Sequence, residues 1–255
     1  MLLEMKFRSK ELKKETQVNV ILPDGTASRE AGEPCRVLWL LHGLSGTYND
    51  WVTRSSILRY AKENDLAVIM PDGDRSWYTD TAYGANYFSY LTKELPQLCY
   101  ETFRQLSPKR EYNLIGGLSM GGYGAMKAAL TCPQQYAACI SLSGSLDITR
   151  KNRACDLPLW KAIFGYDLES PFELEGTPHD LFALAKSNRE KGLPFPKLYL
   201  WCGLEDSLLN VNRFFHQLLT DLDVEHKYEE STGDHSWKWW DLHIQPGIRY
   251  VLNKE

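Results

Sequence analysis

The chain has 255 residues, of which 43% are hydrophobic and 24% charged, and this composition excludes a disordered, fibrous or coiled-coil chain. With 29 Lys and Arg against 33 Asp and Glu, the formal net charge of −4 leaves no surplus of cations for phosphates, so we expect no nucleic-acid partner. The longest apolar run in a strand-like segment, Val37 to Leu41, is far shorter than the roughly 20 residues that span a bilayer, so we expect no membrane partner.

The first residues and the cysteines indicate the compartment. Met1 to Lys6 include an acid and lack the apolar stretch of a signal peptide. The cysteines form no Cys-x-x-Cys pair, and several, such as Cys139 and Cys202, lie among apolar residues. In a chain of this length they indicate buried free thiols rather than a disulfide framework. We therefore expect a cytoplasmic protein.

Short apolar segments alternate with longer segments of helical spacing along the whole chain. An opening antiparallel pair is predicted at 2–8 and 17–22, followed by buried strands at 37–41, 66–70, 113–115, 138–142 and 198–202 and a polar edge strand at 225–230. Helices are predicted at 51–63, 87–105, 121–131, 207–222 and 237–253. This alternation predicts an α/β fold, a mostly parallel sheet with helices on both faces, whose ligands bind at the carboxyl ends of the strands.

One stretch interrupts the alternation. Roughly fifty residues separate the strands at 138–142 and 198–202, which is long for a connection within a domain. They include bulky apolar residues such as Trp160 and Phe164, together with several prolines. We expect a single domain over 1–255, with an insertion at about 145–195 that forms short helices and a cap or lid over the strand ends.

The segment Gly117-Leu118-Ser119-Met120-Gly121 is a G-x-S-x-G motif that follows an apolar run and precedes an Ala-rich helical pattern. This context is typical of a nucleophile elbow, in which a serine lies on a sharp strand-to-helix turn. The two glycines let the chain cross itself closely, and the following helix directs its N-terminal N–H groups at the reacting centre. The alternative is an ordinary Gly-rich turn, but the context favours Ser119 as a nucleophile.

A serine hydroxyl needs a base, which comes last in the chain order of such sites. His235 follows the last predicted strand and precedes the last predicted helix, so it lies at the carboxyl edge of the sheet. The remaining histidines lie inside predicted strands or helices, in the insertion or in an early loop: His42, His179, His216, His226 and His243. The sequence therefore favours His235 as the base.

The acid that orients the base is expected after the preceding strand. Asp206 lies three residues beyond Gly203 and just past the strand at 198–202. Glu205 is its neighbour and competitor, and Asp234 is a third candidate, although a sequence neighbour of His235 reaches the imidazole poorly. A helix N-cap is the alternative role for Asp206. We favour Asp206 as the acid.

Negative charge develops on the carbonyl oxygen of an attacked ester, and hydrogen-bond donors must already point at it. One donor is expected to be the N–H of Met120, directly after the nucleophile. The second is expected from the loop 42–46, His-Gly-Leu-Ser-Gly, where the Leu44 N–H is the candidate. We expect His42 to brace this loop rather than to act as a second base.

Bulky side chains follow several strand ends, and we assign Trp77, Tyr78 and Trp237 to substrate binding in a small apolar acyl slot. At least half of the aromatic residues in these loops are expected to pack the core instead. No metal or cofactor is expected, because His235 has no second His or Cys at ligand spacing and the chain has no nucleotide-binding glycine motif.

Four motifs together resemble one family. Leu-His-Gly-Leu-Ser-Gly at 41–46, Gly-Leu-Ser-Met-Gly-Gly at 117–122, Cys-Gly-Leu-Glu-Asp at 202–206 and Gly-Asp-His-Ser-Trp-Lys-Trp-Trp at 233–240 are similar to the esterase D family of α/β-hydrolases. The likeness covers nearly the whole chain and is greatest to the bacterial tributyrin esterase branch. It implies an α/β-hydrolase fold and a serine carboxylesterase that hydrolyses short-chain acyl esters of small molecules without a cofactor. It also implies a Ser119, Asp206 and His235 triad with Leu44 and Met120 as the oxyanion hole.

Other activities remain open within this resemblance. The family includes feruloyl and acetylxylan esterases and S-formylglutathione hydrolases. Ser45-Gly46-Thr47 stands where the S-formylglutathione branch has a cysteine, which weakens the thioesterase interpretation. An acyltransferase of the related mycolyl type uses the same acyl-enzyme, and a non-catalytic binding protein on this scaffold would have lost a triad residue. A homo-oligomer is compatible with the sequence.

Overall fold

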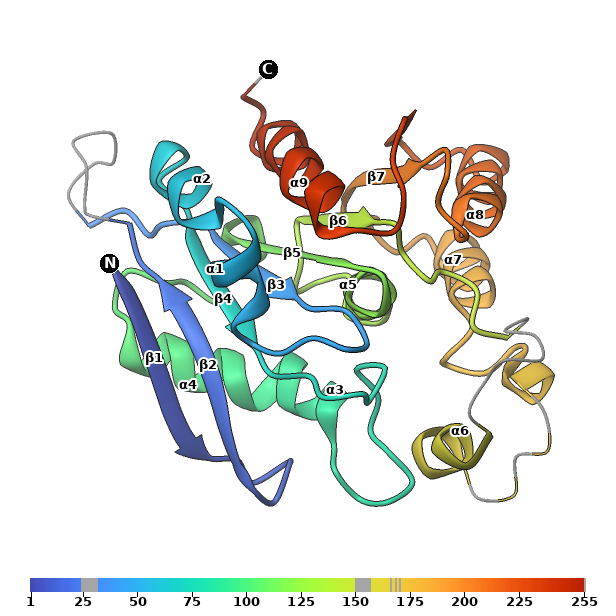
Figure 1. Ribbon diagram of the computed structural model, residues 1–255, viewed down its shortest axis with the longest axis horizontal. Helices are drawn as coiled ribbons and strands as arrows, with labels where there is room; N and C mark the ends of the chain where they lie inside the picture. The colour runs from blue at the N-terminus through green and yellow to red at the C-terminus, as the bar shows by residue number, and fades with distance from the viewer. Residues whose placement is uncertain (24–31, 150–156, 166, 168, 170, 255) are drawn as a thin grey trace.

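The computed structural model describes residues 1–23, 32–149, 157–165, 167, 169 and 171–254, and within them one mixed sheet runs in the order β1-β2-β4-β3-β5-β6-β7-β8 (Figure 1). Its strands are β1 (Leu2–Arg8), β2 (Glu15–Ile21), β3 (Val37–Leu41), β4 (Ala67–Pro71), β5 (Asn113–Leu118), β6 (Ala138–Leu142), β7 (Lys197–Gly203) and β8 (His226–Ser231). β1 and β2 pair antiparallel, β2 also pairs antiparallel with β4, and the remaining pairs are parallel. This confirms the predicted mostly parallel sheet, with β8 at its edge.

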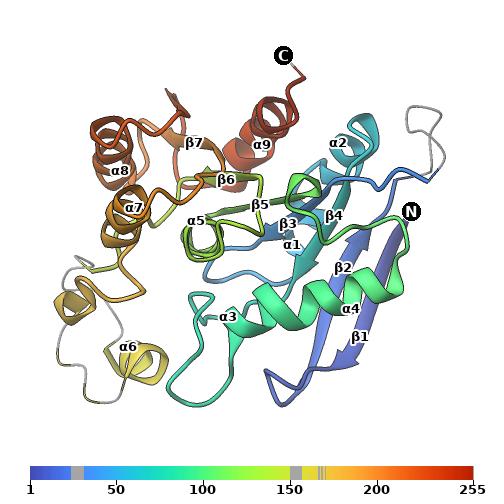
Figure 2. The ribbon, with the colours of Figure 1, turned by 180° about the vertical axis from the view of Figure 1, so that it is seen from behind.

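Helices cover both faces of the sheet (Figures 1 and 2). The helical segments are α1 (Asp50–Arg54), α2 (Ile57–Glu63), α3 (Tyr87–Ser89), the π-helical η1 (Tyr90–Glu94), α4 (Leu95–Thr102), the 3₁₀ turn η2 (Arg110–Tyr112), α5 (Met120–Thr131), α6 (Leu157–Phe164), the 3₁₀ turn η3 (Pro171–Leu174), α7 (Leu181–Glu190), α8 (Leu209–Asp221) and α9 (Trp237–Val251). α1, α2 and α9 pack on one face, whereas α4, α5, α7 and α8 pack on the other.

The central strands are apolar on both faces because both faces are covered. Along β3, Val37, Trp39 and Leu41 belong to the core beneath α4 and α5, while Leu38 and Leu40 belong to the core beneath α1, α2 and α9. Side chains alternate between the faces with a period of two, so a strand buried on both sides is a continuous apolar run. The run Val37 to Leu41 was the sequence signal for this strand.

The predicted helix at 51–63 is two helices, because the backbone of Ser55 is extended (φ −141°, ψ 171°). Its hydroxyl donates to the Trp51 carbonyl, a local bond that competes with the helix ladder. The predicted helix at 87–105 contains a wide turn, η1, between α3 and α4, in which the Leu95 N–H reaches the Tyr90 carbonyl five residues back. Pro96, which has no N–H to give to the ladder, follows this turn in the first turn of α4.

The predicted insertion contains α6 and α7, which lie at the opposite end of the molecule from β1 and β2 (Figure 1). Residues 150–156, 166, 168 and 170 of this stretch lie outside the described residues, as does Cys155. The action of this segment as a lid stays a prediction.

The described cysteines, Cys35, Cys99, Cys132, Cys139 and Cys202, are free thiols. No helix within the described part of the chain is both long and apolar enough to cross a membrane.

Lys127 on α5 connects the body of the domain to the insertion. The residue is only 4% exposed, its Nζ donates to Thr79 Oγ1 at 2.7 Å, and the same atom lies 3.2 Å from Nδ1 of His179. Burial lowers the pKa of the Lys127 ammonium to about 7, against a weaker opposing effect of Asp80. Burial and the nearby Lys127 lower the pKa of His179 to about 3, so His179 is neutral and accepts.

We predict that Lys127→Met changes the pH dependence of stability. Because the pKa of Lys127 is lower in the folded protein than in the unfolded chain, the unfolded chain binds more protons between pH 7 and about 10.5. Wild-type stability should therefore rise with pH in this window relative to Lys127→Met, by up to about 1.4 kcal/mol per pH unit. Urea unfolding at several pH values above 7 measures this slope.

The exposed helical Lys186 on α7 provides the control, because Lys186→Met alters the same side-chain type without removing a buried group. Parallel stability curves for wild type and Lys127→Met from pH 7 to 9 would contradict the assigned role of burial.

Candidate active site

Ser119 lies on the turn that joins β5 to α5, and its backbone has φ 53° and ψ −118°. A positive φ is strained for a serine and persists only where surrounding bonds hold it. Here the Ser119 N–H donates to the Leu142 carbonyl at 3.0 Å, and the Ser119 carbonyl accepts the N–H groups of Tyr123 and Ser145, each at 3.1 Å. The turn is therefore fixed to β6 on one side and to α5 on the other.

The glycines that flank Ser119 are required by close backbone contacts. A Cβ atom at Gly117 would lie 2.5 Å from the carbonyl carbon and oxygen of Gly121. A Cβ atom at Gly121 would lie 2.5 Å from the Leu41 carbonyl oxygen, at the end of β3. The chain thus crosses itself at the turn, which is the physical reason for the G-x-S-x-G spacing.

The structure brings Ser119, His235 and Asp206 together from three loops. His235 Nε2 lies 3.0 Å from Ser119 Oγ, and His235 Nδ1 lies 2.8 Å from Asp206 Oδ2. The Asp206 side chain is fully buried, whereas the His235 side chain is 34% exposed. One nitrogen of the imidazole therefore hydrogen-bonds a buried carboxylate, and the other hydrogen-bonds a serine hydroxyl at the surface of a pocket.

Two opposing effects set the ionisation of Asp206. Burial raises its pKa, but hydrogen bonds from His235 and from the Leu208 N–H, at 2.8 Å, outweigh burial. The net result is a pKa below the usual range of an aspartic acid, so the carboxyl is charged at neutral pH. Charge on Asp206 favours the Nδ1–H tautomer of His235, which leaves Nε2 free to accept the serine proton.

Ser143 is a part of the site that the sequence analysis missed. Its hydroxyl hydrogen-bonds Asp206 and accepts the Trp240 indole N–H at 3.1 Å. Ser143 directly follows β6, at the carboxyl edge of the sheet, and that position was the available signal.

The competing acids have other partners. Glu205 Oε2 accepts the Gly233 N–H at 2.6 Å, and the Glu205 N–H donates to the Gly233 carbonyl at 3.0 Å. Asp234 accepts the hydroxyl of Ser236. Glu205 thus holds the loop that carries His235, whereas Asp206 is the acid in contact with the imidazole.

His42 braces the loop 42–46 against the loop that follows β4. The Gly73 N–H donates to His42 Nε2 at 2.8 Å, and His42 Nδ1 donates to the Gly43 carbonyl at 2.7 Å. Burial lowers the pKa of His42, so the ring is neutral and can make both bonds. A Cβ atom at Gly43 would lie 2.8 Å from Leu118 Cδ1 and 3.6 Å from Ser119 Cβ, so this loop lies directly against the nucleophile turn.

The predicted oxyanion donors lie on the two segments next to the nucleophile, the loop 42–46 and the start of α5. Leu44 lies in the braced loop and lines the pocket beside Ser119. Met120 is the first residue of α5, so its N–H is one of the unpaired donors at a helix N-terminus. The contact of either N–H with an ester oxygen stays a prediction.

A pocket of about 490 Å³ contains Ser119 and His235. Its other walls come from the loop 42–46, from α1, from the end of β5 and from the start of α9: Gly43, Leu44, Ser45, Gly46, Asp50, Arg54, Leu118, Ser236, Trp237 and Trp240. Trp237 stands edge-on to Trp51, with ring centroids 5.0 Å apart, and this contact fixes its position at the wall.

Trp77 and Tyr78, also assigned to substrate binding, do not line this pocket. They are only 2% and 1% exposed. The Tyr78 ring fills a slot between glycines, since a Cβ atom at Gly73 or Gly124 would lie 2.4 Å from it, and its hydroxyl donates to the His42 carbonyl at 3.0 Å. Trp77 packs edge-on against Trp160 at 5.2 Å. The structure gives both residues packing contacts behind the site.

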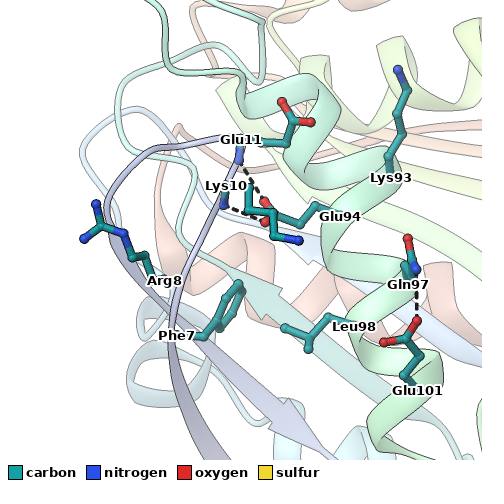
Figure 3. A pocket seen from close by; sticks show the side chains of 9 residues that line it. All are labelled: Phe7, Arg8, Lys10, Glu11, Lys93, Glu94, Gln97, Leu98 and Glu101. Carbon is teal, nitrogen blue, oxygen red and sulfur yellow. Dashed lines mark hydrogen bonds between the residues drawn. The ribbon is translucent and has the colours of Figure 1, made fainter.

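A second hollow, of about 440 Å³, lies between the β1–β2 hairpin and α4 (Figure 3). Figure 3 shows the Glu94 carboxylate beside the Lys10 and Glu11 backbone, whose N–H groups it accepts at 2.7 and 3.3 Å. The side chain of Glu94 therefore holds the hairpin through these hydrogen bonds, and no histidine is among the residues that line this hollow. Within the described ranges, no three His, Cys, Asp or Glu side chains are grouped so that they could hold a metal ion.

The chain is similar to known esterases over nearly its whole length. Residues 9–250 match the model of the Esterase family, which is described as “Putative esterase”. The chain belongs to this esterase family. An acetyl esterase of Caldicellulosiruptor saccharolyticus is 33% identical over 265 residues, which cover 98% of this chain and 97% of the relative.

Solved structures show the same fold. The substrate-bound fluorophosphonate-binding serine hydrolase F of Staphylococcus aureus has a TM-score of 0.90 at 33% identity, over 99% of this chain and 98% of that one. An S-formylglutathione hydrolase from the same organism has a TM-score of 0.87 at 33% identity, over 99% of both chains. The predicted α/β-hydrolase fold and esterase D-type family are confirmed, and the protein is a serine esterase that hydrolyses carboxylic esters.

We predict that Asp206→Asn inactivates this esterase while Glu205→Gln does not. The amide cannot stabilise the imidazolium that forms during catalysis, so kcat should fall by roughly 10³- to 10⁴-fold. Glu205→Gln keeps an acceptor for the Gly233 N–H and should reduce kcat far less. Steady-state hydrolysis of an aryl acetate measures both, and the reverse order of the two effects would contradict Asp206 as the acid.

Proposed function

We propose that the protein hydrolyses esters of short-chain acids through an acyl-enzyme formed on Ser119, with His235 as base and Asp206 as its orienting acid. The observation that carries this proposal is the continuous hydrogen-bonded series from Asp206 through His235 to Ser119, with contacts of 2.8 and 3.0 Å, in one pocket. The name of the acetyl esterase relative supports a short acyl group.

The reaction follows from these contacts. His235 Nε2 accepts the Ser119 proton as Oγ attacks the ester carbonyl, and the buried Asp206 stabilises the resulting imidazolium. The N–H groups of Leu44 and Met120 stabilise the oxyanion. The imidazolium then protonates the departing alcohol. In the second half of the reaction, His235 takes a proton from water as it attacks the acyl carbonyl. The imidazolium then returns this proton to Ser119 Oγ as the bond to the acyl carbon breaks, which releases the acid and restores Ser119.

The pocket walls limit the acyl group. Trp237 and Trp240 stand beside His235, with the Trp240 ring edge-on to the imidazole at 4.9 Å. Such rigid aromatic walls exclude long chains but separate acetyl, propionyl and butyryl weakly, because one methylene is worth only about 1–3 kcal/mol. The same walls could stack an aromatic acid, so a hydroxycinnamoyl ester is the second candidate among oxygen esters.

A thioester is a further candidate, which the 33% identity to an S-formylglutathione hydrolase favours. In this chain Ser45-Gly46-Thr47 stands where the S-formylglutathione branch has a cysteine, so we place oxygen esters before thioesters. We also infer a cytoplasmic location, supported by the free thiols of the described cysteines, four of which are buried.

We predict that Ser119→Ala abolishes covalent labelling by a fluorophosphonate and lowers kcat by about 10⁶-fold, because no other hydroxyl takes its place. Ser45→Ala is the matched variant: Ser45 lines the same pocket but makes no hydrogen bond to a histidine among the described residues. It should still be labelled. Labelling of Ser119→Ala at wild-type rate would contradict the assignment.

We predict a maximum of kcat/KM at two to four acyl carbons in a series of p-nitrophenyl esters from acetyl to palmitoyl, because the aromatic walls leave a small slot. Methyl ferulate, assayed alongside, tests the second candidate. A maximum at eight or more carbons, or a large preference for methyl ferulate, would contradict a short-acyl slot.

A further inference from the structure

The active-site pocket carries an ion pair that the proposed hydrolysis does not use. Arg54 is the last residue of α1, and its Nε lies 3.9 Å from Oδ1 of Asp50, one turn earlier on the same helix. Both residues line the pocket that holds Ser119 and His235. A permanently charged guanidinium therefore stands in the same cavity as the nucleophile.

The pair holds Asp50 more firmly than Arg54. The Asp50 side chain is 19% exposed, and its Oδ2 lies so near Gly46 that a Cβ atom there would be 2.7 Å away. The Arg54 side chain is 58% exposed, and the 3.9 Å contact is longer than a hydrogen bond. The Arg54 side chain makes no other ion pair or hydrogen bond with the described residues, so its terminal N–H groups can bind a ligand.

The residues that line the pocket differ in exposure. Leu118 and Trp240, at 2% and 5% exposure, are buried walls, whereas Arg54 faces solvent. We therefore place the short acyl group against these buried walls. The alcohol portion of the ester, which must leave, then extends toward the exposed Arg54.

We propose that Arg54 binds a carboxylate on the alcohol portion of the substrate, and that Asp50, at 3.9 Å, competes only weakly with this carboxylate for the guanidinium. The planar fork of an arginine matches a carboxylate. The negative charge of Asp50 beside it favours a singly charged group over a phosphate dianion. This specificity rests on the proposed function, because it requires an ester positioned at Ser119.

The test compares the meta and para isomers of acetoxybenzoate with the corresponding neutral acetoxybenzamides, using the full-length protein. The readout is the ratio of kcat/KM for each acid to that for its amide. We expect Arg54→Gln to lower this ratio about fivefold, the scale of an exposed charge pair, and Arg54→Glu to lower it further. Asp50→Asn should raise the ratio, because it removes the negative charge that competes with the substrate.

The matched control is Arg59→Gln. Arg59 on α2 is 62% exposed and pairs with Glu63 at 3.8 Å across one helical turn, but it does not line the pocket. It should leave the ratio unchanged, and added salt should weaken the Arg54 effect. A ratio insensitive to Arg54→Gln for both isomers, or equally changed by Arg59→Gln, would overturn the subsite alone. Failure of the wild type to hydrolyse either acid or amide would overturn the proposed function and, with it, the subsite.

Discussion

The positive φ of Ser119, 53°, is the constraint on which the rest of the site depends. With an ordinary backbone at this residue, the chain could not turn from β5 into α5 within one residue and leave the hydroxyl exposed at the sheet edge. The strain is balanced by hydrogen bonds to Leu142, Tyr123 and Ser145, and it is sterically allowed by Gly117 and Gly121. The glycines near Ser119 in sequence and the hydrogen bonds from neighbouring segments thus fix the same backbone turn.

The parallel sheet supplies the other groups from the same edge. The loop after β3 contains Leu44. The loops after β6, β7 and β8 carry Ser143, Asp206 and His235, respectively. Two of these loops touch so closely that a Cβ atom at Gly203 would lie 1.9 Å from the Gly233 carbonyl oxygen. Glu205 adds two hydrogen bonds across the same contact. The distance between Asp206 and His235 is therefore set by backbone contacts as well as by their own hydrogen bond.

Much of this arrangement could be predicted from the sequence, because its signals are local. The apolar runs predicted the buried strands. The G-x-S-x-G motif, together with the chain order Ser, Asp, His, identified the three residues that the structure brings together. The prediction ended β5 at Ile115, since Gly116 and Gly117 suggest a turn, whereas their backbones continue to pair with Ile140 and Ser141.

Features that depend on distant residues could not be predicted in this way. Tyr78 is buried because Gly73 and Gly124, far apart in sequence, leave a slot for its ring. The pair of Asp50 and Arg54 looks like an ordinary exposed helical pair, and only the packing of α1 beside the nucleophile turn places it in the pocket. Sequence spacing identifies chemistry along one element, but the identity of pocket walls requires the tertiary structure.

Ser119 is proposed to carry the acyl group during turnover. Wild-type protein mixed with an acetyl ester and quenched in acid within the first turnover should gain the mass of one acetyl group. Peptide mapping by mass spectrometry should locate that group on Ser119, since its hydroxyl is the one in contact with His235 Nε2. An acetyl group on another residue, or complete turnover without any protein-bound acetyl at the earliest times, would contradict the account.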